Sequence, residues 1–148
     1  MEAQHDFKEL LELFNANRVE YMIVGAYALA FHGVPRNTGD LDIFVRSSGE
    51  NAGRILRALD AFGFGSLDLA ESDFMAPDRV VQLGVPPVRV DLLTSLTGVS
   101  WDDASAGRVA GEYQGVRVTF IGREQFVRNK RAAGRARDLA DLEALGES

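Results

Sequence analysis

The residues best suited to chemistry are two aspartates separated by one apolar residue, Asp40-Leu41-Asp42, at the start of an apolar run. Residues two apart on a strand point to the same side, so both carboxylates would face one way while Leu41 faces the core. Neighbouring carboxylates repel each other unless a cation lies between them, and aspartate is unfavourable in strands. This local cost favours a functional role as oxygen ligands of a metal ion. The alternative is that Asp40 caps a loop and Asp42 lies on an exposed strand edge.

Asp91 is a third isolated acid, within the apolar segment 88–93. On an adjacent strand it would complete an oxygen-rich site for one or two magnesium ions, which lie roughly 4 Å apart in two-metal phosphoryl transfer. In that chemistry one ion activates the attacking hydroxyl and the other neutralises the triphosphate. The alternative interpretation pairs Asp91 with Arg89 or with another nearby cation. The predicted catalytic and metal-binding residues are Asp40, Asp42 and Asp91.

Composition limits the choice of metal and of partner. The 148 residues include no cysteine and two histidines, which excludes disulfides and thiolate metal sites and favours Mg²⁺, Mn²⁺ or Ca²⁺ held by oxygen. The net charge of −6 gives no overall attraction to nucleic acid. The N-terminus does not resemble a signal peptide, and the longest apolar run, 22–31, is shorter than the roughly 20 residues that a membrane span needs. We therefore expect a soluble, cytoplasmic protein.

A basic stretch lies near the C-terminus, where residues 128–137 contain five cations and no acid. The cations are Arg128, Lys130, Arg131, Arg135 and Arg137. One interpretation is an exposed helix face, and the other is contact with RNA or with a triphosphate.

The elements that would position these residues follow from apolar periodicity and from glycine and proline breaks. The pattern predicts helices over 7–14, 27–31, 48–62, 101–109, 123–133 and 137–145. It predicts strands over 21–24, 41–45, 79–83, 88–92 and 116–121, with a turn at 84–87 and a helix break at Gly134. Alternating strands and helices with one hairpin predict a single α/β (α+β) domain over 1–148, with a mixed sheet flanked by helices.

Two segments resemble known families. Residues 21–26, followed by thirteen residues and then Asp40-Leu41-Asp42-Ile43, resemble the signature of the DNA polymerase β-like nucleotidyltransferase superfamily. Asp91 lies where that superfamily carries its third metal ligand. The segment 130–145 resembles the last two motifs of AbiEii-type toxins and their bacterial relatives, which share that fold.

The resemblance implies a nucleoside triphosphate substrate and a set of binding residues. Gly25 and the amide of Ala26 would hold the triphosphate, Lys130 would contact phosphates, and Asp138 would face the same cleft. Arg36 and Thr38 are further candidates from their position alone. The predicted nucleotide-binding residues are Gly25, Ala26, Arg36, Thr38, Lys130 and Asp138. Many active members carry serine or glycine in place of Ala26.

The resulting hypothesis is a magnesium-dependent nucleotidyltransferase that moves a nucleoside monophosphate onto a hydroxyl of tRNA, of a protein or of a small molecule. An antitoxin is the partner that the toxin-like branch would imply. The alternative is a non-catalytic nucleotide-binding module with the same fold, and a metal-dependent sugar transferase is less favoured. His32 is expected at a helix end, and Asp141 and Glu143 are expected at exposed helix positions.

Overall fold

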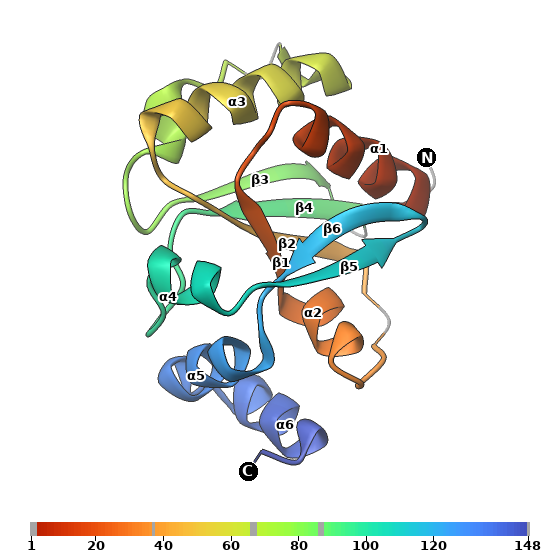
Figure 1. The fold of residues 1–148 in the computed structure, drawn as a ribbon, viewed down its shortest axis with the longest axis vertical. Coiled ribbons are helices and arrows are strands. Elements are labelled where there is room, and N and C mark those ends of the chain that lie inside the picture. The colour runs from red at the N-terminus through yellow and green to blue at the C-terminus, as the bar shows by residue number, and fades with distance from the viewer. Residues whose placement is uncertain (1–2, 37, 66–67, 86–87, 148) are drawn as a thin grey trace.

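The computed structural model describes residues 3–36, 38–65, 68–85 and 88–147 (Figure 1). The helices are α1 (Ala3–Ala16), α2 (Gly25–Phe31), α3 (Gly49–Leu59), α4 (Trp101–Ala106), α5 (Arg123–Ala133) and α6 (Ala136–Leu145), with the short helical segments η1 (Asp60–Phe64) and η3 (Glu71–Phe74). The strands are β1 (Tyr21–Val24), β2 (Asp40–Val45), β3 (Val80–Val85), β4 (Val88–Leu93), β5 (Val109–Tyr113) and β6 (Val116–Phe120).

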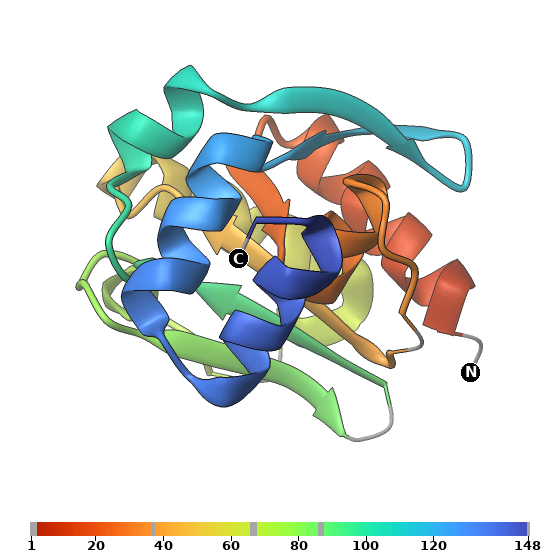
Figure 2. The same ribbon diagram turned by 90° about the horizontal axis from the view of Figure 1, so that it is seen from below.

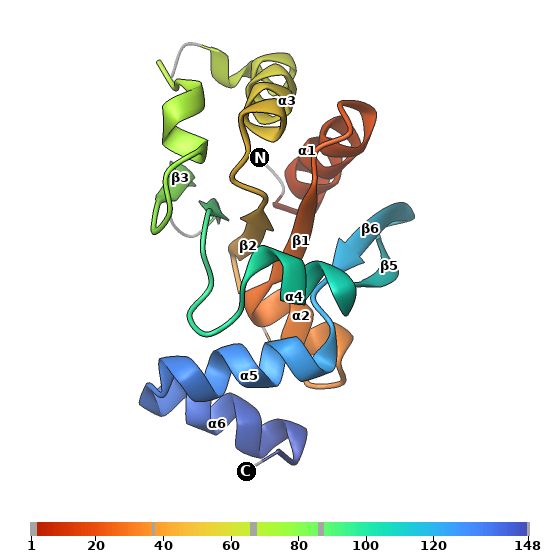
Figure 3. The same cartoon turned by 60° about the vertical axis from the view of Figure 1, so that its left-hand side comes forward.

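The six described strands form one mixed sheet in the order β3-β4-β2-β1-β6-β5. The pairs β2–β4 and β1–β6 are parallel, whereas β1–β2, β3–β4 and β5–β6 are antiparallel. Helices α1 and α3 cover one face, and α5 and α6 lie on the opposite side (Figures 1 and 3). This confirms the predicted α/β class and the mixed sheet.

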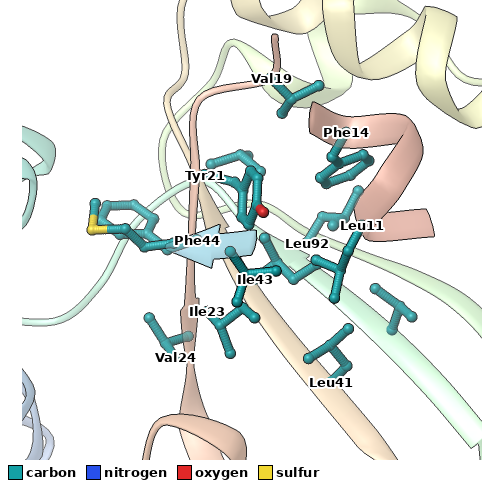
Figure 4. Packing of buried hydrophobic residues seen from close by; sticks show 14 of the residues in the cluster. Leu11, Phe14, Val19, Tyr21, Ile23, Val24, Leu41, Ile43, Phe44 and Leu92 are labelled. Atoms are coloured by element: carbon teal, nitrogen blue, oxygen red, sulfur yellow. The ribbon is translucent and has the colours of Figure 1, made fainter. Parts of the chain in front are cut away.

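The hydrophobic core lies between the sheet and α1 and α3. Leu11 and Phe14 of α1 point toward Ile43 of β2 and Leu92 of β4 (Figure 4). Leu41 is fully buried on this face, as expected for the residue between the two aspartates. Burial of such apolar side chains is the main stabilising contribution, about 1.5–3 kcal/mol each.

Strand register places the polar residues of the opposite face in defined rows. Asp42 is opposite Val24 on one side and Asp91 on the other, and Asp91 is opposite Gln82 of the edge strand. The next row is apolar and runs through Met22, Phe44, Leu93 and Val80. Asp42 and Asp91 therefore have an apolar row beside them on the same face.

Several predicted boundaries were wrong. The helix predicted over 101–109 ends at Ala106, and Val109 begins strand β5, which the sequence did not predict. A two-residue turn at Gln114 and Gly115, both with positive φ, joins β5 to β6 and matches the right-handed twist of a hairpin.

Other differences are smaller. Helix α2 begins at Gly25, two residues earlier than predicted. The helix predicted over 48–62 is divided into α3 and η1, and Gly63 within η1 adopts a non-helical φ of 105°. Strand β3 extends to Val85 into the predicted turn, whose two prolines lie outside the described residues. Helix α5 and the break at Gly134, which has a left-handed φ of 64°, were predicted correctly.

Within the described part of the chain, no helix combines the length and the apolar character that crossing a membrane requires.

Candidate functional site

A cleft of about 530 Å³ separates the sheet from α5 and α6. Seen from below, these two helices lie in front of the strands that carry the aspartates (Figure 2). All three predicted carboxylates line the cleft, together with Gly25, Ala26, Arg36, Thr38 and Lys130. The structure therefore brings together side chains from β2, β4, the loop before β2 and α5.

The three carboxylates come from the parallel strands β2 and β4. Because Asp42 and Asp91 are register partners, their side chains leave the same face of the sheet, and Asp40 follows two residues before Asp42. Burial, reinforced by the charges of Asp91 and Asp40, raises the pKa of Asp42 to about 6. A divalent cation at this position would offset that repulsion.

Arg89 supplies the positive charge next to these carboxylates in the structure. Its guanidinium lies 3.0 Å from Asp91 through Nε and 3.5 Å from Asp40 through Nη2. The Nε atom and Asp91 Oδ1 are both buried and unaligned for a hydrogen bond. The pairing of Asp91 with Arg89, which the sequence left as an alternative, is thus present. Within the described residues, no group of three acidic, histidine or cysteine side chains is arranged as a preformed metal site.

Two features of the structure require glycine at position 25. Its φ is +65°, and a Cβ atom at this position would collide with Oδ2 of Asp42. The first residue after strand β1 thus leaves room for the Asp42 carboxylate. The Asp42 carboxylate therefore lies close to the backbone at the start of α2, and a side chain at position 25 would prevent this approach.

The loop before β2 contributes two residues to the cleft. The Asp40 backbone amide donates a hydrogen bond to Thr38 Oγ1 at 3.1 Å, which fixes the start of the strand. Arg36 reaches across the cleft wall and pairs with Asp141 of α6. The loop and the C-terminal helix are therefore joined by an ion pair beside the carboxylates.

Lys130 lies in a network of buried charges on α5 and α6. Its Nζ atom is 3.2 Å from Asp138 Oδ1 and 3.2 Å from Asp141 Oδ2. Burial raises the pKa of Asp138, but hydrogen bonds from Arg135 and Lys130 outweigh that effect and hold the pKa below its usual value. Lys130 therefore enters the cleft from a fixed position.

Two acids of α6 lie elsewhere than the sequence suggested. Asp141 is only 3% exposed and lines the cleft, so the expected exposed position was wrong, whereas Glu143 is exposed as expected. Asp138, expected to face the cleft, has no exposed surface and lies behind Lys130. Asp138 and Asp141 are three residues apart and therefore share one face of a helix. This spacing was the signal that could have placed Asp141 in the interior next to Lys130.

The basic stretch divides between two surfaces. Lys130, Arg135 and Arg137 line the cleft. Arg128 and Arg131 line a separate groove on the outer side of α5, where acidic residues accompany them. His32 follows the last residue of α2, as expected at a helix end, and its Nε2 lies 2.8 Å from the carbonyl oxygen of Ile121.

Comparison with known proteins identifies the fold. The amino-acid sequence matches no known protein-family profile and no curated protein. Among solved structures, TM1012 of Thermotoga maritima, provisionally classed as a nucleotidyltransferase, is 17% identical with a TM-score of 0.64, and the match covers 96% of this chain and 91% of that one.

Two further structures are similar. An antigenic nucleotidyltransferase-like protein of Paracoccidioides brasiliensis is 18% identical with a TM-score of 0.57, over 99% of this chain and 74% of that one. The lincosamide antibiotic adenylyltransferase LnuA, solved with lincomycin bound, is 12% identical with a TM-score of 0.56, over 96% of this chain and 95% of that one. At these identities the likeness shows the fold alone: the chain has the nucleotidyltransferase fold.

Proposed function

We propose that the protein transfers a nucleoside monophosphate from a nucleoside triphosphate to a hydroxyl acceptor, with Mg²⁺ or Mn²⁺ bound by Asp40, Asp42 and Asp91. The observation that supports this proposal is the meeting of the three carboxylates with Lys130 in one cleft. The similarity of fold to an adenylyltransferase is consistent with it.

The donor set is suited to a hard divalent cation. Carboxylate oxygens are the ligands that Mg²⁺ prefers, and the buried Asp91 Oδ1 accepts no hydrogen bond although Arg89 Nε lies 3.0 Å away. Burial and the charges of Asp91 and Asp40 raise the pKa of Asp42 in spite of the opposing charges of Lys130 and Arg89, so a further cation at this position would be favourable. When bound, the metal would supply Lewis-acid stabilisation of charge on the phosphate oxygens. Arg89 must then leave the carboxylates, since it lies between two of them.

The residues around the carboxylates would bind and orient the triphosphate. Lys130 and Arg36 face the cleft as fixed cations and would offset the negative charge of the phosphates. Gly25 and Ala26 line the cleft beside Asp42, where the missing side chain of Gly25 leaves space. In the reaction the acceptor oxygen forms a bond to the α-phosphorus and loses its proton to water. The bond from that phosphorus to the bridging oxygen breaks, and pyrophosphate leaves with the electron pair.

A second candidate function is nucleotide binding without turnover. The ion pairs of Arg89 with Asp91 and Asp40 favour this alternative, because they satisfy two carboxylates without a metal. Assignment to the toxin-like branch, an antitoxin partner, a single domain over 1–148 and a cytoplasmic location remain predictions from the sequence.

The test is transfer of label from α-labelled nucleoside triphosphates in Mg²⁺, with total RNA, lysate protein and small hydroxyl compounds as acceptors. The Asp40→Ala, Asp42→Ala double variant should transfer nothing. A matched control is the Asp102→Ala, Asp103→Ala variant, which removes two exposed acids of α4 outside the cleft and should keep wild-type activity. Triphosphate binding without transfer to any acceptor would favour the second candidate. Transfer by the double variant would reject the carboxylate site.

A further inference from the structure

The two sides of the cleft differ in charge. On the side of α2 and the loop before β2, the described residues include the cation Arg36. Lys130 of α5 lies in the same region, because it and Arg36 both pair with Asp141. A triphosphate carries several negative charges and requires such cations. This side is therefore the place for the nucleotide phosphates, and the acceptor must approach from the other side of the aspartates.

That other side begins at Asp91 and extends over the edge strand β3. Gln82 is the register partner of Asp91, and Val80 is the register partner of Leu93, so these side chains share the face that carries the carboxylates. Leu96 continues the apolar surface beyond the end of β4. Among the described residues of β3, of the end of β4 and of the loop after it that line the cleft, none is charged; they are Val80, Gln82, Leu93, Ser95, Leu96 and Thr97.

Val80 is the most exposed of these apolar side chains. It is 52% exposed, although Leu83 on the same strand is buried against the core. An exposed valine is ordinary when isolated, but this one adjoins Leu93 and lies one row from Asp91. A partly apolar surface with a neighbouring amide and hydroxyls is the usual lining of a small-molecule site.

RNA fits this surface poorly. A nucleic-acid backbone requires a series of cations along its path, and the described cleft residues of β3, of the end of β4 and of the loop after it supply none. The cations that α5 and α6 add to the cleft are Lys130, Arg135 and Arg137. The net charge of −6 adds a general repulsion. The whole cleft, which the triphosphate and the acceptor would share, has a volume of about 530 Å³, so the space for the acceptor is that of a small ligand, whereas a protein partner requires a broad contact surface.

From these observations, and resting on the proposed function, we infer that the acceptor is a small, uncharged molecule with a hydroxyl group and an apolar part. It would bind over Val80 and Leu93 with its hydroxyl next to Asp91. Gln82 would hydrogen-bond the polar part of the acceptor, since its exposed amide is the nearest neutral donor and acceptor on β3.

The experiment compares neutral acceptors with their charged counterparts in the label-transfer assay. The pairs are uridine with uridine monophosphate, N-acetyltyrosinamide with N-acetyltyrosine, and methyl glucoside with glucose 6-phosphate. Comparison of octyl glucoside with methyl glucoside tests the apolar part. We expect label on at least one neutral compound, and at least about tenfold less on its charged counterpart.

A Val80→Lys variant separates acceptor binding from nucleotide binding. It should raise KM for the neutral acceptor about tenfold or more and reduce the preference over the charged counterpart. Its affinity for Mg²⁺ and nucleoside triphosphate should stay within about twofold. The matched control is Val109→Lys, which makes the same change at an exposed valine of the other edge strand, outside the cleft, and should leave KM unchanged.

Each result decides the inference. Label on RNA or lysate protein alone would overturn it, and so would triphosphate binding without label on any neutral compound. Equal transfer to neutral and charged members of a pair would also overturn it. If the wild type neither binds triphosphate nor transfers label, the proposed function is rejected, and this inference with it.

Discussion

Replacing Arg89 with glutamine should lower the free energy of unfolding in the absence of metal and increase the stabilisation that Mg²⁺ provides. The guanidinium, whose side chain is 27% exposed, is the cation paired with Asp91 and Asp40. Removing one partner of a fully buried ion pair costs about 3–5 kcal/mol. With partial exposure and solvent screening we expect a loss of about 1–2 kcal/mol in the free energy of unfolding. For a domain of this size that loss lowers Tm by about 3–8 °C in EDTA.

The response to metal should change in the opposite direction. Arg89 competes with Mg²⁺ for Asp40 and Asp91, so its removal should tighten Mg²⁺ binding about tenfold, which corresponds to about 1.4 kcal/mol. Because a ligand that binds only the folded state stabilises it, Mg²⁺ should raise the Tm of Arg89→Gln by more than it raises that of the wild type.

The assay is thermal unfolding over a Mg²⁺ titration. The matched control is Arg54→Gln, which removes an arginine of similar exposure, 25%, from its pair with Glu50 on α3. It should not alter the Mg²⁺ response. If Arg89→Gln binds Mg²⁺ no more tightly than the wild type does, the idea that Arg89 occupies the place of the metal is refuted.

Three further changes test the remaining parts of the site. Asp42→Asn should raise the free energy of unfolding in EDTA by about 1–2 kcal/mol at pH 7.5, measured by chemical denaturation. Because the folded-state pKa of about 6 lies above the unfolded value, wild-type stability falls as pH rises from about 4 to 6, so this gain should vanish near pH 4. Asp141→Asn should weaken triphosphate binding about tenfold in calorimetry because Arg36 loses its partner and Lys130 keeps only Asp138, whereas Glu143→Gln on the same helix should not. Gly25→Ala should cost more stability than Gly115→Ala, since both have positive φ but only the first would meet a neighbouring side chain; equal losses of about 1 kcal/mol would contradict the close approach to Asp42.

The central part of the fold and site could be predicted from the sequence because its signals are local. The apolar run 21–24 with its terminal glycine gave strand β1 with correct bounds, and the alternation around Asp40 and Asp42 gave β2 within one residue. The isolated acid at position 91 was correctly expected on a strand adjacent to β2. At positions 40, 42 and 91 a polar residue interrupts an apolar pattern at a position that the strand period defines.

Other features depend on contacts between distant segments. Strand β5 is largely exposed and contains Gly111 and Glu112, so its apolar alternation is weak, and its pairing with β6 defines it. Asp141 is buried because Arg36, 105 residues earlier, and Lys130 meet it. No helical period can show a partner at that distance.

The ion pairs of Arg89 illustrate the same point. A strand period places Arg89 and Asp91 on one face, and the sequence allowed that pair as an alternative to a metal. Only the register of β2 with β4 brings Asp40 to the same guanidinium. The competition between an internal cation and a metal is therefore a property of the sheet.

The most direct test of the account is Mn²⁺ binding, measured by the electron paramagnetic resonance of free Mn²⁺, with a non-hydrolysable triphosphate present. We predict that the wild type binds Mn²⁺ together with the nucleotide. The Asp40→Asn, Asp42→Asn, Asp91→Asn variant, once shown to be folded by circular dichroism, should bind neither Mn²⁺ nor the nucleotide. The concentration of free Mn²⁺ should then equal that in a protein-free mixture of Mn²⁺ and the nucleotide. Equal Mn²⁺ binding by the folded triple variant and the wild type would contradict the assignment of these carboxylates as the metal site.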